Sequence, residues 1–402
     1  MANKHLLFTL LPLALCDLST KLFREEIVNT GAEPFFDSFF KTLRASDGNI
    51  KCAFFDLENT IINGSIAKAI FAYQLREIEF AFKKEDVRPI FGFEDAFTSS
   101  IDTPYHSCVP DSFIFSNTVV NLDSIVNDIE YLYDDRRKPT HKKKIQALIA
   151  VWYRLVNARF PAIERCEFLG TSVCYRLLHG MDKIERQTLM KKALAASVGG
   201  AIDVYEHIHV NGPQQTTLKV HLKVELSPYP EALYLMRALK NINVHPFLIS
   251  RLHSDYVHSA TEAFELGIPL SDCDGSYYSI KDELPQEKRF FFNEGQGKVA
   301  TIKKLMKTRR CVPVLGLGGS SGSVEMLQYI LKYEGYAMMM YINHVDPRLL
   351  KLKETNSRRL HLQKLTRSRW ERNEHNAKRV VYRKDEKFKN GDQMRQGEDL
   401  LT

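Results

Sequence analysis

The segment that most constrains the fold of this chain is Lys51–Ile62, KCAFFDLENTII. Its apolar half suits a buried β-strand, and two acids separated by one residue, Asp56 and Glu58, follow directly. Apolar strands of this kind are typical of parallel sheets, which bind ligands at the carboxyl ends of their strands. The segment therefore predicts an α/β fold with a carboxylate nucleophile and a general acid/base at that edge.

Three later apolar runs predict further strands of the same sheet. They cover Val244–Ser250, Cys311–Leu317 and Tyr336–Asn343. Amphipathic helices are expected on either side of the first of these, at Pro230–Asn241 and Ser254–Leu266. Strands that alternate with helices at this spacing indicate βαβ units and a mainly parallel, Rossmann-like sheet.

The long interval between the first two strands predicts an inserted domain. Helical patterns at Ile66–Phe82, Ile145–Phe160 and Gly180–Val210 fill most of it, and Lys83–Thr140 reads as irregular because of its turn residues. We interpret residues 66–222 as a large, mostly helical cap domain. The other expected parts are an N-terminal helical segment (1–48), the α/β core (49–65 and 223–352) and a basic polar tail (353–402).

The net charge of +7 is concentrated in this tail. From Arg348 to Thr402 the chain has 16 Lys and Arg against 8 Asp and Glu, so the rest is close to neutral. Mixed charges without a pattern of stacking aromatics favour a solubilising tail over specific nucleic-acid binding. Weak contact of the tail with anionic lipid is the open alternative.

The seven cysteines predict neither a disulfide framework nor a zinc site, because their number is odd and no CxxC occurs. Cys52 and Cys311 lie in apolar runs, where free thiols behave as small hydrophobes. This usage favours a reducing, cytoplasmic compartment. The apolar run Leu6–Cys16 predicts a packed N-terminal helix, with a signal peptide left open as the alternative.

Polar residues follow each of the first three strands or begin a later helix. Ser250 ends the second strand, Lys298 opens the helical run GKVATIKKL, and the Gly/Ser loop Gly318–Ser323 follows the third strand. With Asp56 and Glu58 they describe a phosphoryl-transfer site. A carboxylate attacks phosphorus, a second acid protonates the leaving oxygen, and a hydroxyl, a lysine and a metal stabilise charge on the phosphoryl oxygens.

This order of motifs resembles the haloacid dehalogenase superfamily, and most closely its phosphoserine-phosphatase-like branch. The segments that carry the resemblance are SPYPEALYLMRALKNINVHPFLIS, VHSATEAFELGI, GQGKVATIKKL and PRLLKL, and GSIAKAIFAYQLR and HGMDKIERQTLMKKAL resemble the edges of that branch's helical cap. The resemblance covers about residues 51–352, outside residues 83–140.

The resemblance implies a role for each site residue. Asp56 would be the nucleophile that forms an aspartyl-phosphate, and Glu58 the acid/base. Asp56 and the Glu58 carbonyl would hold Mg²⁺. The phosphoryl group of a small phosphorylated substrate would be bound by Thr60, Ser250, Arg251, Lys298, Gly319 and Ser320.

The chain departs from the family in the fourth motif, Gly-Asp-x-x-x-Asp, whose acids hold Mg²⁺. Alignment on Gly318 places Gly319 and Ser323 at the two acid positions. Mg²⁺ is usually held by one or two carboxylates, so this loss weakens the expected metal site. The loop either cradles phosphate with its backbone N–H groups or is a plain turn.

Two functions follow from these observations. The first is a phosphohydrolase that acts on a phosphomonoester through Asp56, with weakened metal binding. The alternative is a catalytically impaired protein of the same fold that binds phosphate or a protein partner. The patterns specify neither the substrate nor the oligomeric state.

Overall fold

The computed structural model describes residues 20–28, 30–45, 49–92, 112–115, 118–159, 173–211, 214–278, 290–342 and 345–371. The expectations for Leu6–Cys16 and for the tail beyond residue 371 lie outside this part of the chain. The chain divides into two compact units. Unit 1 comprises residues 1–64, 227–276 and 293–383, and unit 2 comprises residues 65–226, 277–292 and 384–402.

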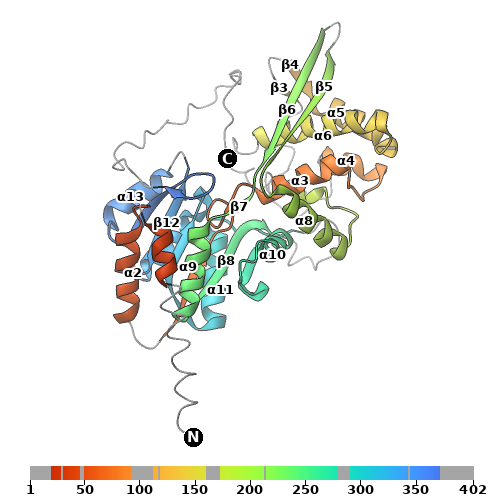
Figure 1. Ribbon diagram of the computed structural model, residues 1–402. Helices are drawn as coiled ribbons and strands as arrows, with labels where there is room; N and C mark the ends of the chain where they lie inside the picture. The colour runs from red at the N-terminus through yellow and green to blue at the C-terminus, as the bar shows by residue number, and fades with distance from the viewer. Residues whose placement is uncertain are drawn as a thin grey trace. The chain divides into compact units, whose positions relative to one another are not determined.

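The predicted parallel sheet is present, in the strand order β10-β9-β8-β1-β11-β12-β13-β14 (Figure 1). All neighbouring pairs from β9 to β13 are parallel, and the two edge pairs are antiparallel. This confirms the α/β, Rossmann-like class. The strands are β1 (Ile50–Phe55), β8 (Val244–His253), β9 (Cys273–Tyr278), β10 (Phe290–Phe291), β11 (Cys311–Gly318), β12 (Tyr336–Tyr341), β13 (Leu360–Leu365) and β14 (Trp370–Glu371).

Helices cover both faces of the sheet, as alternating side chains of the strands require. On one face a buried cluster joins Phe54, Phe247 and Met339 to α11 (Gln296–Arg309), α12 (Val324–Lys332) and α13 (Pro347–Thr355). On the other face the phenylalanines of α2 (Glu33–Ala45) pack on Tyr336, with ring centroids 5.5 Å apart for Phe35. Unit 1 also contains α9 (Pro230–Asn241), α10 (Ser254–Ala263) and the 3₁₀ turns η6 (Leu270–Asp272) and η8 (Ser321–Ser323), and residues 20–27 are helical as well.

The expected start of a polar tail at residue 353 is wrong. Strand β13 pairs in parallel with β12, and β14 then folds back onto β13. Leu360, Leu362 and Trp370 are buried. Sequence patterns did not reveal these strands because β13 has only three apolar residues among polar ones and β14 has only two residues.

Unit 2 is less helical than expected. Its helices are α3 (Ile66–Glu77), α4 (Val87–Phe91), α5 (Leu122–Leu132), α6 (Pro139–Arg159) and α8 (Lys183–Ser197), with 3₁₀ turns η1 (Lys84–Asp86) and η4 (Tyr133–Asp135). Two antiparallel hairpins accompany them: β3 (Ser112–Phe115) with β4 (Thr118–Asn121), and β5 (Ala201–Asn211) with β6 (Gln214–Val224).

The expectation of helix over Gly180–Val210 therefore holds only as far as Ser197. Tyr205 and His207 are buried while Val204 and Glu206 are exposed, which is the alternation of a strand. The stretch 83–140, expected to be irregular, contains the eleven-residue helix α5, whose Asn121 side chain caps its first turn. The chain leaves and re-enters unit 1 through the short antiparallel pair β2 (Ile62–Asn63) and β7 (Ser227–Pro228).

The expectation of free thiols at Cys52 and Cys311 is also corrected. The structure joins them as a disulfide between the adjacent strands β1 and β11, with Cα atoms 5.8 Å apart. The strand register explains the contact. Cys311 pairs with Ile50, and Cys52 lies two residues farther along β1 on the same face of the sheet, so the two cysteines are diagonal neighbours. An odd cysteine count excludes complete pairing but not one isolated pair.

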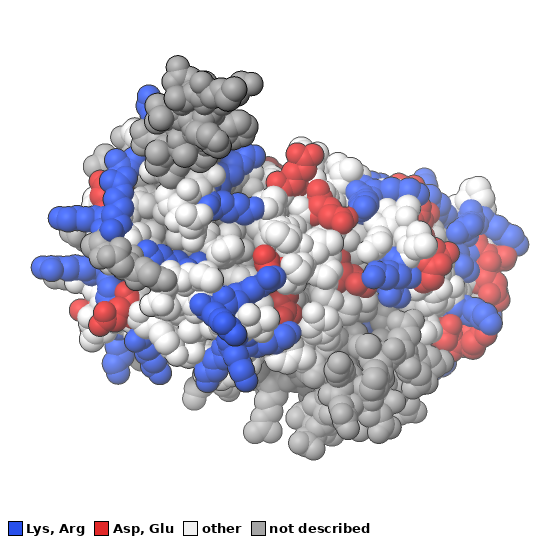
Figure 2. All heavy atoms as spheres, turned by 90° about the horizontal axis from the view of Figure 1, so that it is seen from below, with Lys and Arg blue, Asp and Glu red and all other residues white. Residues whose placement is uncertain are grey.

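Basic and acidic side chains are both present on the face shown in Figure 2, with basic side chains more numerous over one part of it. Among the described helices, none has the length and apolar character needed to cross a membrane.

Candidate active site

Asp56 lies at the carboxyl end of β1, between β8 and β11. Its backbone N–H donates to the carbonyl oxygen of Leu317 at 2.9 Å, so the ladder with β11 continues to this residue. The side chain is buried, with 4% exposed, and its Oδ1 accepts the backbone N–H of Leu57 at 2.9 Å. The sheet thus brings a buried carboxylate to the edge at which α/β proteins bind ligands.

Lys298 and Ser323 meet Asp56 at its other carboxylate oxygen. Lys298 Nζ lies 2.7 Å from Asp56 Oδ2, and Ser323 Oγ donates to the same oxygen at 2.6 Å. Lys298 Nζ also donates to Ser323 Oγ at 2.9 Å. The side chains of Lys298 and Ser323 are completely buried. The three residues form a closed, hydrogen-bonded cluster, which we call the Asp56 triad.

Burial explains why the lysine and the carboxylate must face each other. A lysine ammonium without a counter-charge is very unfavourable in a protein interior. Lys298 occupies the first turn of α11, after Gly295, whose φ of 54° lets the chain turn sharply into the helix. The sequence predicted this lysine but gave no role to Ser323 beyond that of a replaced acid.

Ser250 reaches the same edge of the sheet as Asp56. It lies two residues beyond Leu248, and Leu248 pairs with Phe55 of β1. Its side chain is buried, with 1% exposed. The register therefore aligns Ser250 with the turn that follows Asp56, as expected for a hydroxyl that would contact a ligand there.

Three other expected site residues, Arg251, Glu58 and Thr60, lie in β8 or in the turn that follows β1. The guanidinium of Arg251 lies 3.7 Å from the carboxylate of Glu294, which sequence reasoning had not singled out. Glu58 is half-buried and forms an isolated bridge with Ile62 in the turn after β1. Thr60 is fully buried, and its hydroxyl has no hydrogen-bond partner among the described residues.

The Gly/Ser loop is closely packed, both within itself and against the turn that follows β1. A Cβ atom on Gly318 would lie 2.4 Å from the Cβ of Ser323, and one on Gly319 would lie 2.2 Å from the carbonyl oxygen of Asn59. Neither position can take a side chain unless the backbone moves. Ser320, half-buried, precedes η8 and its carbonyl oxygen accepts the N–H of Ser323 at 3.0 Å.

Arg348 holds this loop from outside and was missed by sequence reasoning. Its guanidinium donates to the carbonyl oxygen of Ser321 at 3.2 Å and pairs with Glu325 at 2.7 Å. Asp346, the N-cap of α13, pairs with the same guanidinium at 2.9 Å. The segment PRLLKL had suggested only the end of the core, because an arginine in a polar segment is usually a surface residue.

The residues present do not fit Mg²⁺ as the family binds it. Both oxygens of Asp56 already accept hydrogen bonds, and no second carboxylate can occupy position 319 without backbone movement. No cluster of three or more His, Cys, Asp or Glu suited to a metal occurs within the described part of the chain. Mg²⁺ prefers octahedral oxygen ligands that include one or two carboxylates, and Lys298 already supplies the local positive charge.

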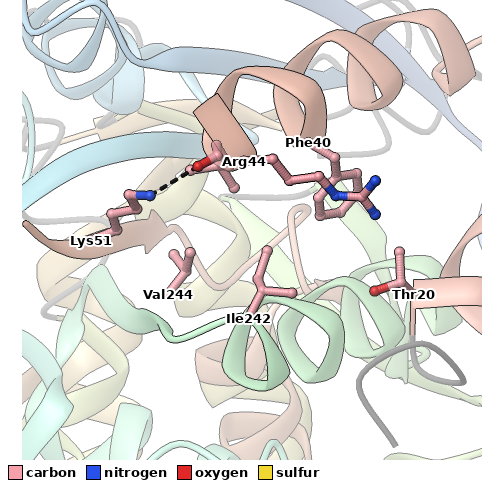
Figure 3. Close-up of a pocket in the computed structure, with 7 residues that line it drawn as sticks. Thr20, Phe40, Arg44, Lys51, Ile242 and Val244 are labelled. Carbon is pink, nitrogen blue, oxygen red and sulfur yellow. Dashed lines mark hydrogen bonds between the residues drawn. The ribbon is translucent and has the colours of Figure 1, made fainter. Parts of the chain in front are cut away.

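A cavity of about 160 Å³ lies away from the triad, at the amino ends of β1 and β8 (Figure 3). Lys51 begins this end of β1 and donates to the carbonyl oxygen of Leu43 at 3.0 Å. Phe40 and Val244 supply apolar walls. Because Asp56 lies at the opposite end of β1, this cavity is not part of the candidate active site.

Comparisons with known proteins support the fold but name no family. No protein-family model matches the chain, and no curated protein is significantly similar. A conserved protein of unknown function from Anaerococcus prevotii DSM 20548 is similar in structure, with a TM-score of 0.65 and 18% identity over 84% of this chain and 96% of that one. This likeness shows a shared fold.

Two further solved structures match less closely. A protein of unknown function from Bordetella pertussis Tohama I has a TM-score of 0.35 and 10% identity, over 78% of this chain and 99% of that one. A dehalogenase has a TM-score of 0.28 and 10% identity, over 79% of this chain and 94% of that one. TM-scores this low carry no argument about function.

Proposed function

We propose that the chain is a haloacid dehalogenase-like phosphohydrolase that cleaves a phosphomonoester through nucleophilic attack by Asp56. The observation that carries the proposal is the Asp56 triad, a buried carboxylate paired with a buried lysine at the carboxyl end of a parallel sheet. Carboxylate nucleophiles of this kind form acyl-phosphate intermediates that split one difficult hydrolysis into two easier steps.

In the first step a carboxylate oxygen of Asp56 attacks phosphorus, and the bond from phosphorus to the ester oxygen breaks. The carboxyl group of Glu58 gives its proton to that oxygen, and the alcohol leaves. In the second step water attacks the aspartyl-phosphate, Glu58 takes back a proton, and inorganic phosphate leaves with Asp56 restored. Lys298 and the hydroxyl of Ser250 stabilise the phosphoryl oxygens.

Two further groups support phosphate binding in this scheme. The unpartnered hydroxyl of Thr60 lies beside Gly319, at the turn that follows Asp56. Gly319 and Ser320 would bind the phosphoryl group through their backbone N–H groups, which can hold an anion without a side chain. Arg251 would contact phosphate only by turning away from Glu294.

Phosphate release from p-nitrophenyl phosphate tests this function. Asp56→Asn should reduce release to the buffer background, because an amide does not attack phosphorus. Glu58→Gln should lower turnover by about 10²–10⁴-fold, the usual contribution of a positioned acid/base. The matched control is Glu354→Gln on the exposed side of α13, which should leave the rate unchanged. Equal rates for the wild type and Asp56→Asn would contradict the proposal.

A second candidate is a phosphate-binding protein of the same fold without turnover. It is favoured by the crowding of Gly319 against Asn59, which excludes the acid that the family uses. Loss of that acid and its metal would remove several kcal/mol of transition-state stabilisation. This candidate predicts binding of inorganic phosphate with no phosphate release above the Asp56→Asn background.

A further inference from the structure

The charges of the Asp56 triad balance without a metal ion. One carboxylate faces one ammonium at 2.7 Å, and both groups are buried. The hydroxyl of Ser323 closes the cluster, since its proton goes to Asp56 and its lone pair receives Lys298. Lys298 therefore directs one donor at Asp56 and one at Ser323, and Ser323 donates to Asp56, so all three side chains are linked within the triad.

A divalent cation would find few ligands in this arrangement. At Asp56 only Oδ1 keeps a lone pair, because Oδ2 already receives two donors and Oδ1 receives the N–H of Leu57. The cation would also lie close to the Lys298 ammonium, which repels it. The hydroxyl of Ser323 is a weak ligand for a hard cation compared with a carboxylate.

The packing of the Gly/Ser loop keeps Ser323 in contact with Asp56. Ser323 packs directly on Gly318, where even a methyl group would meet its Cβ at 2.4 Å. Arg348 fixes the carbonyl of Ser321 from outside, and the N–H of Ser323 bonds the carbonyl of Ser320. The hydroxyl of Ser323 is thus held in one place against the carboxylate.

We propose that this site binds the phosphoryl group of its ligand without a divalent cation, with Lys298 as the counter-charge and Ser323 as a positioning residue that orients both Asp56 and Lys298. The inference rests on the proposed function for the identity of the ligand, and it departs from it in excluding the metal. Inorganic phosphate is therefore expected to bind equally well in the presence of EDTA or of Mg²⁺.

Thermal unfolding of the full chain gives a readout that does not depend on activity. Phosphate should raise the Tm by the same amount in EDTA and in millimolar Mg²⁺, and Mg²⁺ alone should leave the Tm unchanged. Calorimetry should detect no binding of Mg²⁺ or Mn²⁺ to the wild type. A phosphate-induced rise that requires Mg²⁺ would overturn the proposal, and so would the absence of any phosphate-induced rise.

Two variants separate positioning from a merely structural role. Ser323→Ala should weaken phosphate binding by about tenfold or more, about 1.4 kcal/mol or more, without creating metal dependence. Ser323→Asp adds a second carboxylate beside Asp56, so its phosphate-induced Tm rise should become dependent on Mg²⁺. Ser321→Ala, an exposed position of the same loop, is the matched control and should behave as the wild type. Mg²⁺-independent phosphate binding in Ser323→Asp would contradict the assigned role.

The two proposals fail in different ways. Metal-independent phosphate binding without phosphate release would leave this inference standing and contradict the hydrolase. Phosphate release that EDTA abolishes would support the hydrolase and contradict this inference.

Discussion

Ser323 and Gly319 belong to one loop, yet they constrain the site in opposite ways. Ser323 contributes a hydroxyl that touches both charged groups of the triad. Gly319 has to lack a side chain, because the carbonyl of Asn59 occupies the space where a Cβ atom would lie. Both residues are therefore closely packed in this loop, and neither leaves an open gap.

Substitution of Gly319 tests this fit directly. Gly319→Ala should destabilise the protein by about 1–3 kcal/mol, because its methyl group would meet the Asn59 carbonyl and force the turn after β1 to move. Urea unfolding measures the effect. Ser321→Ala in the same loop is the control and should change stability by less than about 0.5 kcal/mol. A Gly319→Ala variant as stable as this control would contradict the expected clash, because it would show that the backbone of the loop moves easily to accept the methyl group.

The sequence predicted the charged members of the triad but not its third member. Asp56 follows an apolar strand and Lys298 begins an amphipathic helix, so local pattern and spacing were enough to find them. The contact of Ser323 with Asp56 joins residues 267 positions apart and depends on the register of β1 with β11. A serine in a Gly/Ser loop carries no signal of such a contact, since turns favour serine for local reasons.

At the scale of elements, the strands with continuous apolar runs were predicted and those with mixed charge were not. β1, β8, β11 and β12 are buried on both faces and read as apolar segments. β13 and β14 lie at one edge of the sheet, where lysine and arginine are normal. The length of the folded core was underestimated for that reason.

Trp370 tests whether β14 is part of the folded core. Its side chain is 4% exposed, its ring stacks on Phe36 of α2 at 6.1 Å, and its backbone N–H donates to the buried carboxylate of Glu231 at 3.0 Å. Trp370→Ala should cost about 3–5 kcal/mol of unfolding free energy. Arg369→Ala, its exposed neighbour, should cost less than about 0.5 kcal/mol. Equal stability of the two variants would show that β14 is not part of the folded core.

At the scale of the whole molecule, the two units are joined in a way that sequence patterns only partly indicated. The interval between β1 and β8 was long enough to predict an insertion. Its hairpin β5–β6 was not predicted, because the first residues of β5 were interpreted as a continuation of the helical pattern that ends with α8. The pairing of β2 with β7 was also invisible, since each strand has two residues.

That pairing predicts that unit 1 tolerates loss of the insertion. Asn63 and Ser227 are direct partners in the β2–β7 pair, so residues 66–225 begin and end at neighbouring points. Replacing them with a short Gly/Ser linker should preserve a cooperative thermal transition, because a short flexible loop closes at little entropic cost. Circular dichroism during heating measures this. A product without a cooperative transition would show that unit 1 depends on the insertion for folding.

The most direct test of the account is whether Asp56 carries a phosphoryl group in the absence of metal. Acetyl phosphate has a good leaving group and needs no acid, and Glu58→Gln should slow the second step so that the intermediate accumulates. Peptide mass spectrometry after incubation in EDTA should find one phosphoryl group on the peptide that contains Asp56, and none in the Asp56→Asn, Glu58→Gln double variant. A peptide that stays unmodified, or that is modified only when Mg²⁺ is added, would contradict the account.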